Sequence, residues 1–150
     1  MSEIKFKFNK PDDSPGFLLW QLTMLWQRKI KKVLDDLDLT HTQFVLLASL
    51  AWLEKEQELI SQADIAAQSR TDRMMVSKIM QTLQAKGLIN RHHHKTDTRL
   101  KSVTLTPVGR SVMQKALSLV ERTDIDFFSV LGNRSGSFIY GMNTLIKQNQ

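Results

Sequence analysis

The stretch Asp97-Thr98-Arg99-Leu100-Lys101-Ser102-Val103-Thr104-Leu105-Thr106-Pro107-Val108-Gly109 decides the fold of this chain. Its first part is charged, as expected for a loop tip, and its second part alternates between apolar and hydroxyl side chains. Val103 and Leu105 therefore share one face of a short strand. Thr106 offers a hydroxyl to cap a helix, and Pro107 suits the first helical position, where no backbone N–H is needed. The stretch predicts a loop, a strand and the start of a helix.

Upstream, the sequence predicts a helix that ends at Lys86-Gly87, because glycine is the usual residue just past a helix end. Leu88-Ile89-Asn90-Arg91 then has the composition of a partner strand. A helix, a strand, a basic loop and a second strand, in that order, form a winged helix. We therefore predict a mainly α-helical fold: a winged helix-turn-helix with a two-stranded β-wing.

A helix-turn-helix is predicted just before the wing. Ser61-Gln62-Ala63-Asp64 resembles a capping box and opens a short helix. Gln68-Ser69-Arg70-Thr71 is a short polar turn. A second helix follows over about residues 72–86, and its core-facing residues have helical spacing: Val76, Ile79, Met80 and Leu83.

The opposite side of this second helix carries Arg73, Met74, Ser77, Lys78, Gln81 and Gln84. Arginine and glutamine can read base edges in the major groove, methionine can contact a thymine methyl, and serine and lysine suit phosphates. Alone, such a face is more typical of solvated surface. Because a wing follows it, we interpret this helix as the one that reads DNA.

The motif Asp97-x-Arg99, followed by Val103-x-Leu105-Thr106-x-x-Gly109, resembles the wing signature of the MarR family of transcriptional regulators (multiple antibiotic resistance regulator). Lys86-Gly87-Leu88-Ile89 and Leu39-Thr40-x-Thr42-Gln43-Phe44 resemble further segments of that family, so the likeness covers about residues 37–110. It implies a dimeric repressor of a pseudo-palindromic operator, released by a small aromatic or anionic effector. It also implies that Asp97 holds the wing backbone or orients Arg99.

The basic residues are concentrated in the predicted DNA-binding segment. The net charge is +6, and the segment from Ser61 to Leu105 supplies +5 of it. Such an excess is typical of a protein that binds a polyanion, although ordinary solvated surface can also produce it. We expect Arg99, at the wing tip, to enter the minor groove. The predicted DNA-binding residues are Ser69, Arg70, Thr71, Arg73, Met74, Ser77, Lys78, Gln81, Arg91, Lys95, Asp97, Arg99 and Lys101.

Both ends of the chain predict helices that a winged helix does not need. Ser14-Pro15 marks the start of a helix with apolar residues on two sides, the second row being Phe17, Trp20 and Met24. A long helix from Pro107 is predicted to reach about residue 131, and a last helix starts near residue 137. The long helix has apolar residues at Val108, Val112, Leu119 and Phe127.

We assign residues 15–37 and 107–150 to a dimerisation region and residues 40–105 to a DNA-binding lobe, all within one MarR-like domain over residues 1–150. The surplus apolar surface favours a homodimer, in agreement with the resemblance. With no cysteine, the chain has neither a disulfide nor a thiol switch, which argues against the peroxide-sensing branch of the family. No membrane-spanning run or secretory signal is present, so we expect a cytoplasmic protein.

Catalytic motifs are absent, so we expect neither an enzyme nor a cofactor. Two alternative functions remain open: a metal-responsive regulator that uses His92 or His94, and a winged helix that binds another protein. We expect no metal site, because only alternate histidines of a strand share a face and no cysteine is available. The three tryptophans, Trp20, Trp26 and Trp52, together with Met24 are candidates for an aromatic effector pocket, although such residues are more often plain core. Of these, we assign Trp20, Met24 and Trp52 to the effector site.

Overall fold

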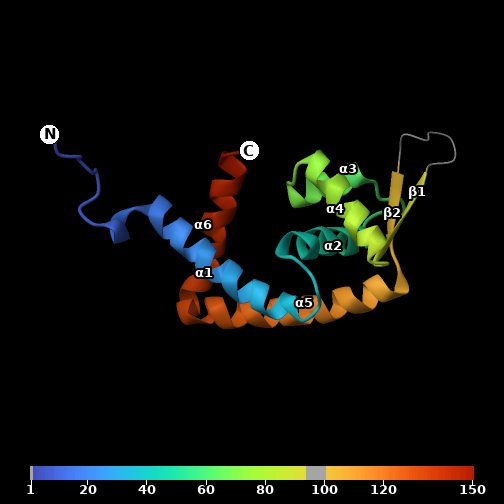
Figure 1. The fold of residues 1–150 in the computed structure, drawn as a ribbon. Helices are drawn as coiled ribbons and strands as arrows, with labels where there is room; N and C mark the ends of the chain where they lie inside the picture. The colour runs from blue at the N-terminus through green and yellow to red at the C-terminus, as the bar shows by residue number, and fades with distance from the viewer. Residues whose placement is uncertain (1, 94–100) are drawn as a thin grey trace.

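A computed structural model describes residues 2–93 and 101–150 as an elongated molecule with a compact lobe at one end (Figure 1). The lobe contains α2 (His41–Leu53), α3 (Gln62–Ser69), α4 (Arg73–Ala85), β1 (Ile89–His93) and β2 (Lys101–Leu105). The rest of the chain forms η1 (Pro11–Asp13), α1 (Pro15–Asp35), α5 (Pro107–Phe128), η2 (Ser129–Arg134) and α6 (Ser135–Gln148). The mainly helical winged helix-turn-helix expected from the sequence is confirmed. No described helix is long and apolar enough to cross a membrane.

Short polar side chains define where α1, α2, α3, α4 and α5 begin, whereas α6 has no side-chain cap. Each accepts a hydrogen bond from a backbone N–H of the first turn, which would otherwise lack a partner. Thr40 and Ser61 form reciprocal capping boxes with Gln43 and Asp64. The remaining caps are Ser14 for α1, Asp72 for α4 and Thr106 for α5.

Helix α2 is the centre of the core. Leu46, Leu47 and Leu50 on this helix are fully buried. The helix packs against α1, α3, α4, α5 and β2. Burial of each leucine stabilises the fold by about 1.5–3 kcal/mol relative to an exposed position. Packing around α2 therefore joins the lobe to the second half of α1 and the first half of α5.

Helices α1 and α5 pack against each other, and each buries only part of its length. In α1, the buried residues are Ile30 and Leu34, both in its second half. In α5, the buried residues are Gly109, Met113, Ala116 and Val120. Of the apolar positions named from the sequence, Val108 is 60% exposed, whereas Val112, Leu119 and Phe127 are partly buried, and Val112 packs against the core.

The chain reverses between α5 and α6 through η2, where Gly132 has a φ of 54°. Glycine adopts this left-handed conformation without the steric cost that a side chain would add. Helix α6 begins at Ser135, two residues earlier than expected, and contains no buried residue.

The two strands pair antiparallel, with Ile89 opposite Leu105 and Arg91 opposite Val103. Val103 and Leu105 are both buried, as the alternating pattern predicted. The backbone N–H of Val103 also donates to the carbonyl of Ile60, with an N···O distance of 2.8 Å. The base of the wing is thereby attached to the residue that precedes the N-cap of α3.

We predict that Gly109→Ala strongly destabilises the protein. A Cβ atom at this position would lie 1.9 Å from the carbonyl oxygen of Leu88, a backbone atom held between α4 and β1. Relieving this clash should cost about 3 kcal/mol or more, measured by chemical denaturation at matched protein concentration. The control is Gly136→Ala, because nothing lies within 4 Å of its added Cβ. Equal stability of the two variants would contradict the prediction.

Candidate DNA-binding site

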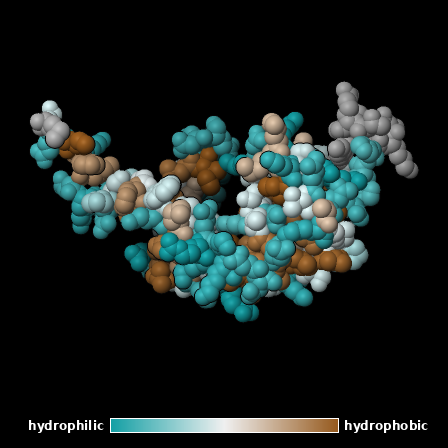
Figure 2. Space-filling view, viewed as in Figure 1, coloured by the Kyte–Doolittle hydropathy of each residue, from teal (hydrophilic) through white to brown (hydrophobic). Residues whose placement is uncertain are grey.

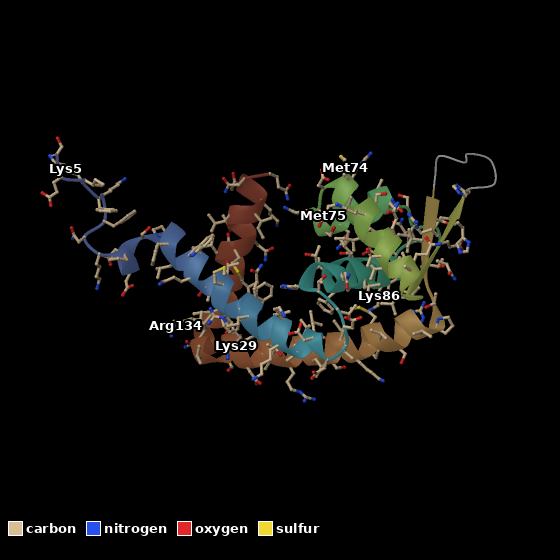
Figure 3. All side chains as sticks on the ribbon, viewed as in Figure 1. Lys5, Lys29, Met74, Met75, Lys86 and Arg134 are labelled. Carbon is tan, nitrogen blue, oxygen red and sulfur yellow. The ribbon has the colours of Figure 1, made fainter. Side chains whose placement is uncertain are left out.

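Helix α4 has one buried side and one exposed side, as the sequence predicted. Val76, Met80 and Leu83 are buried in the core. The other side exposes Arg73, Met74, Lys78 and Gln81, with Ser77 partly exposed. Met74 is 82% exposed and lies at the outer end of the lobe (Figure 3). The hydrogen-bond donors and the methionine thioether on this face are therefore accessible. They are of the types that suit base edges and phosphates.

The turn between α3 and α4 is closed by its own polar groups. The Ser69 hydroxyl donates to the Ile65 carbonyl at 2.7 Å, and the Thr71 hydroxyl donates to the Ser69 carbonyl at 3.4 Å. Arg70 ends α3 with a left-handed φ of 54°. When the side-chain amide of Gln150 is oriented with its oxygen toward Arg70, that oxygen accepts hydrogen bonds from the Arg70 guanidinium. Ser69 and Thr71 therefore shape the turn that leads into α4.

Arg91 connects the wing to both helices of the helix-turn-helix. Its Nε donates to Gln84 Oε1 at 2.6 Å, and its Nη1 donates to Gln62 Oε1 at 3.3 Å. Because these bonds join β1, α4 and α3, Arg91 fixes the angle between the wing and the reading helix. Sequence reasoning had assigned Gln84 only to the exposed face and had given Gln62 no such role.

Four predicted DNA-binding positions in the wing are described little or not at all. Lys95, Asp97 and Arg99 lie outside the described residues, and for Lys101 only the backbone, in β2, is described. Their roles remain predictions.

The histidines at the end of β1 do not form a metal site in the described part of the chain. His92 and His93 are exposed, and His92 Nε2 lies 3.4 Å from the hydroxyl of Thr104. No group of three His, Asp or Glu side chains is placed to hold a metal ion within residues 2–93 and 101–150. His94 lies outside the described residues.

A cleft of about 1020 Å³ separates the second half of α1 from the helix-turn-helix. Trp26 and His41 on one side face Arg70, Thr71 and Met75 on the other. Trp20, Met24 and Trp52, the residues proposed from the sequence for an effector pocket, do not line this cleft. Of the three tryptophans, the one that lines the cleft is Trp26, which lies on the same helical row as the buried Ile30.

A contact between three elements organises the wall of this cleft. The indole N–H of Trp26 donates to Asp124 on α5 at 2.8 Å, and the Trp26 ring meets the His41 ring edge-on, with centroids 5.0 Å apart. Burial lowers the pKa of His41 below its ordinary 6.5, and the negative charge of Asp124 partly offsets that effect. Near neutral pH, His41 is therefore neutral and packs as an aromatic ring.

Comparison with known proteins agrees with this geometry. Residues 35–124 match the family model described as the ArnR1-like, winged-helix domain. Over 141 residues, the chain is 42% identical to the uncharacterized HTH-type transcriptional regulator YdcH of Bacillus subtilis, covering 94% of this chain and 95% of that protein.

Two solved structures share the fold. A MarR-family transcriptional regulator from Silicibacter pomeroyi superposes with a TM-score of 0.75 at 17% identity, covering 98% of this chain and 97% of that one. The protein belongs to the winged helix-turn-helix transcriptional regulators, and its solved structural neighbours include MarR-family proteins. Bordetella bronchiseptica BpsR, whose DNA binding is regulated by 6-hydroxynicotinic acid, superposes with a TM-score of 0.79 at 24% identity. The match covers 95% of this chain and 97% of BpsR.

These matches place the chain among HTH-type transcriptional regulators. The exposed face of α4 carries side chains of the types that suit base edges and phosphates.

We predict that acidification destabilises the protein partly through His41. Because its pKa is lowered in the folded state, the unfolded chain binds the proton more readily. The stability contributed by neutral His41 is fully present above the unfolded pKa of about 6.5 and is lost as the pH falls below that value and through the lowered pKa of the folded state. His41→Gln, which stays neutral, should therefore lose less stability between pH 7 and pH 5 in thermal unfolding. An unchanged pH dependence would contradict the prediction.

Arg73→Ala and Lys78→Ala should affect DNA binding in different ways. An arginine that donates two hydrogen bonds to a guanine contributes about 1–3 kcal/mol of discrimination, so its loss should relax the base preference. Loss of a lysine–phosphate contact should weaken binding to all sequences alike. It should also reduce the slope of log affinity against log salt concentration by about 0.9. Affinity for an operator and its single-base variants, measured across a salt series, tests both. If Arg73→Ala keeps the wild-type base preference, Arg73 does not read DNA.

Proposed function

We propose that the protein is a dimeric repressor that binds a pseudo-palindromic operator and is released by a small-molecule effector. The observation that carries this proposal is the exposed polar face of α4, which is buried on its opposite side and flanked by a wing. This arrangement lets the helix enter a major groove while its apolar residues remain in the core.

A second copy of the chain is the partner that the apolar surface requires. Helix α6 buries no residue, and the first half of α1 is similarly exposed. Figure 2 shows hydrophobic surface over α6. The exposed apolar residues of the two helices are Phe17, Leu18, Leu19, Trp20, Met24 and Leu25 on α1, and Ile139, Tyr140, Met142, Leu145 and Ile146 on α6.

This surface is too extensive for a stable monomer and suits an obligate interface of about 2,000–5,000 Å². Residues 15–37 and 107–150 would then form the dimerisation region, with residues 40–105 as the DNA-binding lobe. A two-fold axis through this region would present the two α4 helices to half-sites about 34–36 Å apart.

The cleft between α1 and the helix-turn-helix is the proposed effector site. Trp26 and His41 offer aromatic surface, and Arg70 offers positive charge, which suits a small aromatic or anionic molecule. The regulation of BpsR by 6-hydroxynicotinic acid supports this class of ligand. A ligand there would contact both the dimerisation helix and the turn that leads into α4.

The wing is expected to bind the adjoining minor groove through Arg99, with Asp97 holding the wing in place. The narrow minor groove of A·T tracts has a strong negative potential that favours an inserted arginine. The two rival functions lack comparable support, because no observation in the described residues favours a metal site or a protein-binding role.

Selection of bound duplexes from a random DNA pool tests the proposed function. We expect enrichment of an inverted repeat, with affinity that falls steeply as salt rises. A winged helix used for protein binding would enrich no sequence. Addition of zinc to the apo protein should leave the enriched sequence and the affinity unchanged.

We predict that Leu145→Glu disrupts the dimer. Leu145 is 65% exposed in the single chain and would be buried at the interface, where an unpaired charge is costly. Sedimentation should show monomer at concentrations where the wild type is dimeric, and operator binding should fall with it. Gln148→Glu adds the same charge at an exposed polar position of the same helix and should remain dimeric. A Leu145→Glu variant that dimerises normally would exclude α6 from the interface.

A further inference from the structure

Lys86 joins the end of the reading helix to the chain that leaves α1. It is the C-cap residue of α4, and its side chain is 27% exposed. Its Nζ donates to the backbone carbonyl of Asp38 and, at 3.3 Å, to Gln43 Oε1. The same Nζ lies 3.4 Å from the Asp38 carboxylate, which is almost fully exposed. Because that carboxylate is solvated, the two hydrogen bonds carry most of the attachment.

The acceptors of Lys86 belong to a closed turn rather than to a flexible linker. The backbone N–H of Leu39 donates to the Leu34 carbonyl, and Asp38 between them has a left-handed φ of 54°. This geometry is a common way to end a helix, and it turns the Asp38 carbonyl away from α1. Gln43 belongs to the capping box of α2. Lys86 therefore binds the point at which α1 ends and α2 begins.

The residue after Lys86 makes the corresponding connection to α5. Gly87 has a φ of 75°, and its carbonyl accepts a hydrogen bond from the Thr106 hydroxyl at 2.6 Å. That hydroxyl also caps α5 by accepting from the Gly109 N–H at 2.9 Å. The C-terminal end of α4 is thus attached to the end of α1 and to the start of α5. Its N-terminal end, near Met74, lies at the outer edge of the lobe (Figure 3).

We propose that Lys86 is a positioning residue that transmits the placement of α1 to the reading helix, and thereby sets the half-site spacing that the dimer accepts. The apolar residues of α4, Val76, Met80 and Leu83, hold the helix within the lobe. Packing of α1 against α2 places the lobe next to α1, and the Lys86 hydrogen bond to the Asp38 carbonyl adds a direct contact between the end of α4 and the turn that follows α1. This inference rests on the proposed function as a dimeric DNA-binding regulator.

The test compares operators that contain the same two half-sites separated by spacers of different length. Wild-type protein should prefer one spacer, because one added base pair moves the half-sites apart by roughly 3.4 Å and rotates them. In Lys86→Met, the ratio of affinities for the preferred and the other spacers should fall about tenfold. A change of this order is expected when a charge-assisted hydrogen bond that fixes the position of α4 is lost. Affinity for a duplex with a single half-site should remain unchanged, since the reading face is intact.

Three variants control the comparison. Lys31→Met removes a lysine from the same cleft, but Lys31 pairs with Asp35 within α1, so the spacer preference should persist. Lys86→Arg keeps the donors and should restore the preference. Lys86→Gln is neutral and polar, and should behave as Lys86→Met if the methionine variant proves unstable.

An independent measurement uses the absence of cysteine in the chain. A single spin label at Lys78→Cys reports the distance between the two α4 helices in the DNA-free dimer. The distance distribution should broaden when Lys86→Met is added and stay unchanged with Lys31→Met.

The outcomes separate this inference from the proposed function. Failure of the wild type to bind any spaced operator would overturn the proposed function and this inference together. A folded Lys86→Met variant that keeps the wild-type spacer preference would overturn the positioning role alone. If both Lys86→Met and Lys86→Gln fail to fold, Lys86 is needed for folding, which would also overturn the positioning role.

Discussion

Helix α2 carries apolar side chains on every side, and this constraint determines how the other elements are arranged. A helix of that kind is stable only when other elements surround it completely. Leu46, Leu47 and Leu50 are accordingly fully buried, with contacts to the helix-turn-helix, to the wing and to α1 and α5. Because α2 is shared in this way, the DNA-binding lobe and the long helices cannot separate without exposing the core.

Apolar packing brings the DNA-binding lobe and the long helices together, and a few polar contacts fix the angles between their elements. Trp26 donates to Asp124, which fixes α1 against α5, while Arg91 bridges the wing and the reading helix. Arg110 pairs with Glu54 at 2.9 Å across α5 and α2, but the arginine is largely exposed, so solvent screening makes this pair weak. The Trp26–Asp124 hydrogen bond, which is partly shielded from solvent, therefore contributes more to the geometry than the surface ion pair does.

Sequence patterns predicted the features that depend on neighbouring residues in the chain. The caps at Ser61 and Thr106 and the alternation in β2 are of this kind, because each depends on residues within one turn or one strand. Features that depend on distant contacts were not predicted. The role of Gly109 follows from the carbonyl of Leu88, twenty-one positions earlier, and the hydrogen bond from Trp26 to Asp124 joins two helices that are distant in the sequence.

The attachment of α4 at its C-terminal end has a geometric consequence for regulation. The helix has 13 residues and is therefore about 20 Å long. A rotation of about 10° around the Lys86 end displaces the other end by about 3 Å, close to the rise of one base pair. The proposed effector cleft is bordered by Lys86 near the C-terminal end of α4 and by Arg70 and Met75 near its N-terminal end. Under the proposed function, a ligand in this cleft would need to rotate the helix only slightly to move both α4 helices out of register with their half-sites.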